Sequence, residues 1–177
     1  SRNLTISRQL VFIEMGQYSS ALKMSDGIKL HTFDVDDKVD IMLHNGLALQ
    51  WLGYFELAVQ KFNKAIELTE IENEYERMIV AYKDLAYLYY LFLDFEKAEL
   101  YAEKALKLSE GHYSEPNDLY CSVLLTLANI YFKQGENAQL QNVIAQLEDQ
   151  IENIRIPFIQ SSWHRILGKF YRSEERR

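Results

Sequence analysis

Four histidines and one cysteine are the side chains of this chain best suited to acid–base, nucleophilic or metal chemistry. They are spread along the sequence, at His31, His44, His112, Cys121 and His164. No spacing matches the His-Glu-x-x-His or Cys-x-x-Cys patterns that bring metal ligands together, and no glycine-rich loop precedes a helix as a phosphate cradle would. We therefore expect no enzyme activity, no metal and no cofactor.

Cys121 is the closest approach to a nucleophile, with His112 or His164 as its base. It lies in an apolar segment, however, where a buried and inert thiol is the usual outcome. A single cysteine cannot form an internal disulfide, which favours a reducing, cytoplasmic location. The acidic pairs Asp36-Asp37 and Glu174-Glu175 stand where a helix begins or the chain ends, and are interpreted as solvated charge.

Composition predicts a folded chain that neither spans a membrane nor contacts nucleic acid directly. The sequence has 177 residues, of which 48% are hydrophobic, and its formal net charge is −7. A negative charge opposes long-range attraction to phosphates. The longest apolar stretch, Leu85 to Leu93, falls well short of the roughly 20 residues that a spanning helix needs, and we interpret it as core.

The elements that must position any binding residue form an internal repeat. The segment Gly53 to Ala58 returns as Leu93 to Ala98, with looser copies at Gly16 to Ala21 and Gly135 to Leu140. The four turn residues are spaced by 37, 40 and 42 positions; they are Gly16, Gly53, Leu93 and Gly135. A period near 40 residues indicates helical pairs, each of which buries its apolar face by stacking on its neighbours.

Aligning the turns places small residues in columns, where missing side chains let two helices approach closely. The column before the turn is Gly46, Ala86, Ala128 and Gly168, with Gln9 in the first unit, and the columns after it are Ala21, Ala58, Ala98, Leu140 and Ile28, Ala65, Ala105, Leu147. Larger side chains fill the space between the helices, at the spacing that an amphipathic helix requires. They are Phe12, Leu49, Tyr89, Tyr131 and Tyr171.

This pattern resembles the tetratricopeptide repeat over nearly the whole chain. The resemblance implies an all-α fold, an α-solenoid with a right-handed superhelix, and a single repeat domain. Its units would be residues 2–32, 36–70, 73–110 and 117–155, followed by one further helix at 157–173. By the spacing of their turns, the units are longer than the standard unit of about 34 residues. The fourth unit departs from the pattern at Asn137 and Leu140. Because stacked repeats need capping helices, we expect the chain to be a fragment of a longer protein.

In tetratricopeptide arrays, the first helix of each unit lines a concave groove. Transferring the groove positions predicts peptide-binding residues at Trp51, Lys83, Tyr87, Tyr90, Asn129, Phe132, Lys133, Arg165, Lys169 and Arg172. Nearer the amino end, the transferred positions are mostly apolar and include Ile6, Leu10, Asp40, Leu43, Leu47 and Val80. The inferred groove therefore becomes more basic toward the carboxyl end.

Such a surface suits a short peptide or an extended protein segment. Lysine and arginine can hold a carboxylate through charge-assisted hydrogen bonds, while aromatic rings bury apolar side chains. The carboxamide of Asn129 can both donate to and accept from a peptide backbone. The alternative is that the lysines are only solvated and the tyrosines pack against the next unit.

The pattern of the chaperone-tail clamps is absent, since Ile6 and Leu10 occupy its first-unit positions. The long units and the segments Phe12 to Tyr18 and Tyr131 to Glu136 resemble the Gram-positive peptide-pheromone receptors, the Rap, NprR, PlcR and PrgX group. That resemblance implies the sensor domain of a peptide-responsive, quorum-sensing transcription regulator. The alternative function is a scaffold or assembly module that joins protein partners or self-associates into a homo-oligomer.

Overall fold

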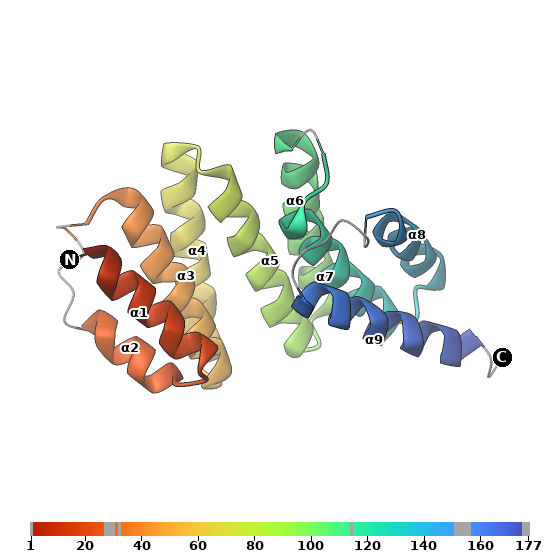
Figure 1. Cartoon of the computed structure of the whole chain (residues 1–177), viewed down its shortest axis with the longest axis horizontal. Helices are drawn as coiled ribbons and strands as arrows, with labels where there is room; N and C mark the ends of the chain where they lie inside the picture. The colour runs from red at the N-terminus through yellow and green to blue at the C-terminus, as the bar shows by residue number, and fades with distance from the viewer. Residues whose placement is uncertain (1, 27–30, 32, 114, 151–156, 175–177) are drawn as a thin grey trace. The chain divides into compact units, whose positions relative to one another are not determined.

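Every regular element in the described part of the chain is an α-helix (Figure 1). The computed structural model describes residues 2–26, 31, 33–113, 115–150 and 157–174. The helices are α1 (Arg2–Glu14), α2 (Tyr18–Asp26), α3 (Val35–Trp51), α4 (Phe55–Glu72), α5 (Tyr75–Leu91), α6 (Phe95–His112), α7 (Asp118–Gln134), α8 (Asn137–Glu148) and α9 (Pro157–Glu174). The predicted all-α repeat architecture is confirmed.

The chain divides into two compact units, Ser1–Leu88 and Tyr89–Arg177, with the boundary inside α5. In the first unit, α1 and α2 pack against each other and against α3, which in turn packs on α4. In the second unit, α7 packs on α6, α8 and α9. In each unit the leading helix of one hairpin therefore contacts a neighbouring hairpin, as stacked helical pairs require.

Polar side chains fix where three of the helices begin. Asp34 accepts a hydrogen bond from the Asp37 N–H at 2.9 Å, and Asp94 accepts one from the Lys97 N–H at 3.2 Å. At the start of α7, Asn117 accepts from the Tyr120 N–H at 2.9 Å. Each bond satisfies a donor that a helix amino terminus would otherwise leave unpaired.

The four aligned turn residues share a left-handed backbone. Their φ angles are 71° at Gly16, 82° at Gly53, 63° at Leu93 and 77° at Gly135. Glycine adopts this conformation freely, whereas a side chain with a Cβ pays for it. Leu93 is 68% exposed, so little packing compensates for its strain. Of the four turns, the one between α5 and α6 therefore has the most backbone strain at its left-handed residue.

Replacing Leu93 with glycine is expected to stabilise the protein by about 0.5–1 kcal/mol, because the strain is relieved and little buried surface is lost. The matched control is Gly53→Ala, where a Cβ would meet nothing within 4 Å, so that only the backbone is tested. It should destabilise by a similar amount. Thermal and urea unfolding would measure both, and a stable Gly53→Ala variant would contradict the backbone explanation.

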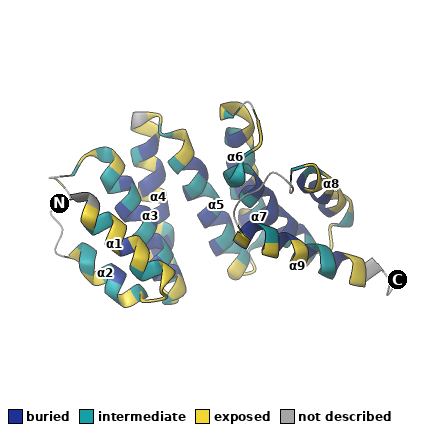
Figure 2. Cartoon of the chain, in the orientation of Figure 1, coloured by how far each residue is buried: buried dark blue, intermediate teal, exposed yellow. Residues whose placement is uncertain are grey.

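Most residues of the small columns are buried, and Figure 2 shows buried residues in the helices of both units. The alanines of the two post-turn columns, Ala21, Ala58, Ala65, Ala98 and Ala105, are all 0% exposed. The column member Ile28 lies outside the described residues. At Gly46 a Cβ would lie 2.5 Å from Cε1 of Phe62, which is itself fully buried, so here the close approach of two helices depends on the missing side chain.

Gln9 is the polar member of these columns, and its amide nitrogen is hydrogen-bonded while its buried Oε1 has no partner among the described residues. Its Nε2 donates to Asn45 Oδ1 at 2.7 Å, and the Ser25 hydroxyl donates to the same oxygen at 2.8 Å. Gln9 is 0% and Asn45 6% exposed. These bonds join α1, α2 and α3 across residues that are distant in sequence.

Two expectations about the core are wrong in part. Tyr171 is 53% exposed and does not fill an interhelical space. The apolar stretch from Leu85 is buried only at its start, since Leu91, Phe92 and Leu93 are 39%, 43% and 68% exposed at the end of α5 and in the turn. Within the described residues, no helix combines the length and apolar character needed to cross a bilayer.

Candidate functional site

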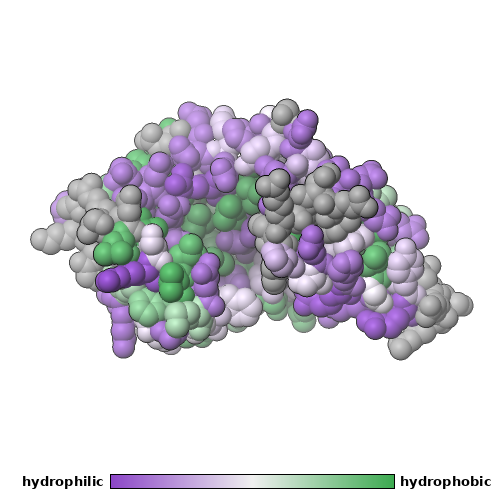
Figure 3. Space-filling model, viewed as in Figure 1, coloured by the Kyte–Doolittle hydropathy of each residue, from purple (hydrophilic) through white to green (hydrophobic). Residues whose placement is uncertain are grey.

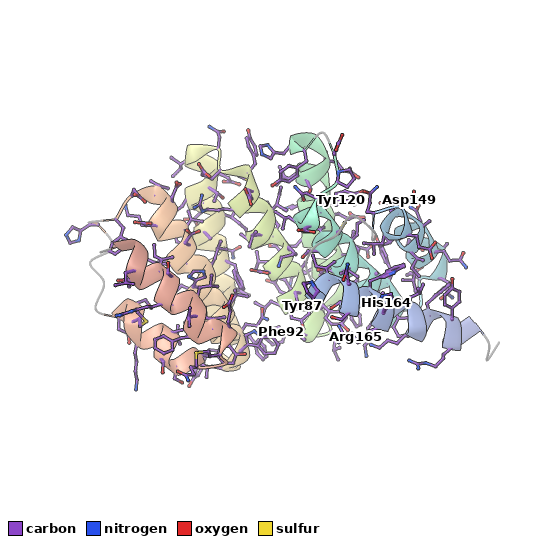
Figure 4. All side chains as sticks on the ribbon, in the orientation of Figure 1. Tyr87, Phe92, Tyr120, Asp149, His164 and Arg165 are labelled. Atoms are coloured by element: carbon purple, nitrogen blue, oxygen red, sulfur yellow. The ribbon has the colours of Figure 1, made fainter. Side chains whose placement is uncertain are left out.

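The strongest cluster of predicted binding residues lies on α7 and α9 in the second unit. One face of α9 is buried, with Ile159, Trp163, Ile166 and Phe170 at most 6% exposed. Arg165, Lys169 and Arg172 follow the helical i, i+4, i+7 spacing on a different face, and Lys133 lies in the last turn of α7. Figure 4 shows Arg165 projecting from α9. We call Lys133, Arg165, Lys169 and Arg172 the basic cluster.

The four cations of the basic cluster lie close enough for the charges of three of them to act on Lys169. Burial lowers the pKa of Lys169, and the positive charges of Arg165, Lys133 and Arg172 lower it further. The Lys169 ammonium also lies 5.8 Å from the ring centre of Phe132, within cation–π range. None of the four forms an ion pair with a residue that the structure describes. Like charges one turn apart repel each other and destabilise a helix. An anion bound at the basic cluster would reduce this repulsion.

Two other predicted residues of the second unit have local partners. The amide of Asn129 donates to the Leu125 carbonyl, one turn earlier in α7, at 2.7 Å. Its oxygen is the atom left to meet a ligand N–H unless the side chain rotates. The ring of Tyr90 lies 6.3 Å from that of Phe95, across the turn between α5 and α6.

The predicted residues of the first unit do not form a cluster of their own. Trp51 is 52% exposed and stacks on Tyr18 at the α3–α4 turn, with ring centres 6.0 Å apart. The Lys83 ammonium pairs with Asp84 at 2.7 Å, so its charge is already balanced. Tyr87 is half-buried on α5 (Figure 4).

The first unit instead contains a pocket of about 430 Å³ between α1, α3 and α5. It is lined by Leu10, Asp40, Leu43, His44, Leu47, Glu76, Arg77, Val80 and Asp84. Figure 3 shows apolar surface between α3 and α5, bordered by hydrophilic residues. Transferring groove positions by alignment identified Leu10, Asp40, Leu43, Leu47 and Val80, but not His44 or the charged residues of α5.

The structure places the one cysteine of the chain in a buried position. Cys121 is buried, and burial, with a smaller contribution from Asp118, raises the pKa of its thiol to about 11, so the reactive thiolate is scarce at neutral pH. Among the described residues, no three histidine, cysteine, aspartate or glutamate side chains are grouped so as to hold a metal ion.

The fold is that of a tetratricopeptide-like helical repeat, and comparison with known proteins agrees. Residues 38–111 match the model of the tetratricopeptide repeat family. No curated protein matches the chain. Residues 38–111 are therefore similar to tetratricopeptide repeats, and the chain has an all-α repeat architecture.

Two solved structures are similar in fold. A Podosopora anserina protein designated a kinesin light chain, with nearly identical TPR-like repeats, aligns with a TM-score of 0.75 at 14% identity, covering 99% of this chain and 87% of that one. BtubC (BKLC) from P. vanneervenii aligns with a TM-score of 0.65 at 17% identity, covering 91% and 68%. At such identities the likeness concerns the fold alone. Tetratricopeptide repeats commonly serve as protein–protein interaction modules, the class of function that these findings support.

Proposed function

We propose that this protein is a protein-binding repeat module whose basic cluster holds an acidic, extended segment of a partner. The observation that carries the proposal is the concentration of four cations without described counter-ions beside the half-buried ring of Phe132. Carboxylates of the partner would form charge-assisted hydrogen bonds with the cluster, and an apolar side chain would pack on the ring.

The positive charge of the basic cluster contrasts with the chain as a whole, which carries a net charge of −7. An acidic ligand is therefore repelled by the protein at long range and attracted only where cations are concentrated. A negative overall charge combined with a local cluster of cations disfavours non-specific binding of acidic partners and favours their docking at the basic cluster.

A probe of simple composition tests the proposal. A fluorescein-labelled peptide of alternating glutamate and leucine should bind, with an affinity that falls as salt is added, whereas its glutamine counterpart should bind at least about fivefold more weakly. Lys169→Gln should weaken binding of the glutamate peptide to a similar extent. Fluorescence anisotropy titration measures both.

Lys107→Gln is the matched control, since Lys107 is an exposed lysine on α6 in the same unit and its loss changes the net charge equally. It should leave the affinity unchanged. Equal effects of the two substitutions, or equal binding of the glutamine peptide, would exclude the basic cluster as the binding site.

A peptide sensor is a more specific form of the same function. It is supported by the sequence resemblance to peptide-pheromone receptors, and it requires that a bound peptide bias a conformational or oligomeric equilibrium. Light scattering coupled to size exclusion, with and without saturating glutamate peptide, distinguishes a peptide sensor from a scaffold. A peptide-dependent change in mass favours a sensor, and binding at constant mass favours a scaffold.

A further inference from the structure

We propose that the pocket between α1, α3 and α5 is a second binding site, and that it takes an arginine or lysine side chain from an extended protein segment with apolar neighbouring residues. This inference goes beyond the proposed function, because it concerns another site in the other unit and a ligand of opposite charge. It rests on the pocket's volume, its charge and its apolar walls.

The volume of the pocket, about 430 Å³, lies within the range of small-ligand sites. Four of its lining side chains are aliphatic: Leu10, Leu43, Leu47 and Val80. Long basic side chains bury their methylene stems against such surfaces while their charged ends stay with polar groups. Leu10 is 40% exposed and gives an apolar neighbour of the inserted side chain a surface to contact.

The charge of the pocket is negative. Its lining includes three carboxylates, those of Asp40, Glu76 and Asp84, and one fixed cation, Arg77. Lys83 pairs with Asp84 from outside the lining, so the net charge of these five groups is −1. His44 adds no positive charge at neutral pH, because burial lowers its pKa in spite of the opposing effect of Asp40 and Asp84. Its Nδ1 is buried and has no hydrogen-bond partner among the described residues. A ligand donor is one way to satisfy that nitrogen.

Arg77 is not available to hold an acidic ligand. Its Nε donates to Asp40 at 2.8 Å and its Nη2 to the other oxygen of Asp40 at 3.3 Å, while Nη1 donates to Glu74 at 3.1 Å. These bonds, first among them the pair with Asp40, raise the pKa of Arg77 above its usual range. Its charge is thus already balanced within the first unit, and a ligand carboxylate would meet net negative potential.

Asp84 is the most buried carboxylate of the lining, and it already pairs with one cation. It is only 5% exposed, and the Lys83 ammonium contacts its Oδ1 at 2.7 Å. A carboxylate has two acceptor oxygens, so a ligand guanidinium or ammonium group can share Asp84 with Lys83 through charge-assisted hydrogen bonds. Asp84 and the exposed Glu76 lie eight residues apart on α5, one deep in the pocket and the other at its edge.

The test uses a blocked, fluorescein-labelled peptide of alternating leucine and arginine, and a second peptide with citrulline in place of arginine. Citrulline keeps the shape and removes the charge. The arginine peptide should bind about tenfold more tightly, the value of one charged hydrogen bond. Amide shifts in ¹⁵N-labelled protein should map to Leu43, His44 and Val80. Equal affinities, or shifts confined to other helices, would overturn the proposal.

Matched variants separate the pocket from general attraction to an acidic protein. Glu76→Gln should weaken arginine-peptide binding about two- to threefold, as expected for an exposed charge, while Glu70→Gln on α4 should not, although both remove one exposed negative charge. Asp84→Asn should cost about tenfold. Because Glu76 is exposed, its variant keeps the test valid even if Asp84→Asn disturbs folding. Equal effects of Glu76→Gln and Glu70→Gln would contradict the site.

The same variants keep the two sites distinguishable. Lys169→Gln should leave the arginine peptide bound, and Asp84→Asn should leave the glutamate peptide bound. Failure of the basic cluster to bind glutamate peptides therefore has no bearing on the pocket, and the reverse holds as well.

Discussion

Gly46→Ala is expected to destabilise the protein by about 2 kcal/mol, although alanine is the better helix former. The added Cβ would lie 2.5 Å from Cε1 and 2.8 Å from Cδ1 and Cζ of Phe62, distances that no relaxed side chain tolerates. Phe62 is 0% exposed, so its ring has no free space into which to move. Overpacking of this kind costs about 1–3 kcal/mol, which exceeds the gain of about 1 kcal/mol in helix propensity.

Gly168→Ala provides the control, because Gly168 occupies the same column of the repeat and also lies within a helix. A Cβ there would meet nothing within 4 Å, so only the helix propensity changes and a gain of up to about 1 kcal/mol is expected. Urea unfolding of the two variants should move in opposite directions. Combining Gly46→Ala with Phe62→Leu should recover part of the loss. If Gly46→Ala proved as stable as the parent, the close contact between α3 and α4 would be wrong.

Asn45→Leu is expected to cost about 2–3 kcal/mol, because it removes the acceptor shared by Gln9 and Ser25. Ser25 keeps its bond to the Leu22 carbonyl at 2.7 Å, whereas the Gln9 amide retains only a long contact of 3.4 Å to the Ala21 carbonyl. A buried donor that loses its partner carries the full desolvation cost.

A double-mutant cycle with Gln9→Met tests this account. Replacing both polar groups by apolar ones of similar size leaves no orphaned donor, so the double variant should be less destabilised than the sum of the single variants by about 1–2 kcal/mol. Chemical denaturation supplies all four free energies of unfolding. Strict additivity would show that the hydrogen bond between α1 and α3 contributes nothing of its own.

The repeat was predictable from sequence because its turns and columns recur. The shared left-handed backbone at Gly16, Gly53, Leu93 and Gly135 follows directly from the alignment, even where leucine replaces glycine. Small residues in register correctly marked the buried contacts at Ala58 and elsewhere. At Gly168 the expected close contact is absent, because a Cβ there would meet nothing within 4 Å. The alignment identifies small residues, but a close contact also requires a neighbouring helix at that position.

The polar contacts were less predictable, because side-chain direction is not periodic. Gln9 bonds to Asn45, a residue 36 positions away, and only the packing of α1 on α3 brings them together. Lys83 stands at a transferred groove position, yet its ammonium turns to the adjacent Asp84. Arg77 has a long side chain that lines the pocket. An alignment of backbone positions does not show how far a side chain extends. The four residues of the basic cluster were predicted by transferring the groove positions of tetratricopeptide arrays, which depend on the backbone alignment alone.

The state of Cys121 has a practical consequence for labelling. The chain holds one cysteine, and it is buried with a thiol pKa of about 11. A maleimide dye at neutral pH should therefore spare the native thiol and attach to any cysteine newly placed on the surface, for example at Lys107. Fluorophores or spin probes can be installed one at a time without first deleting the natural residue.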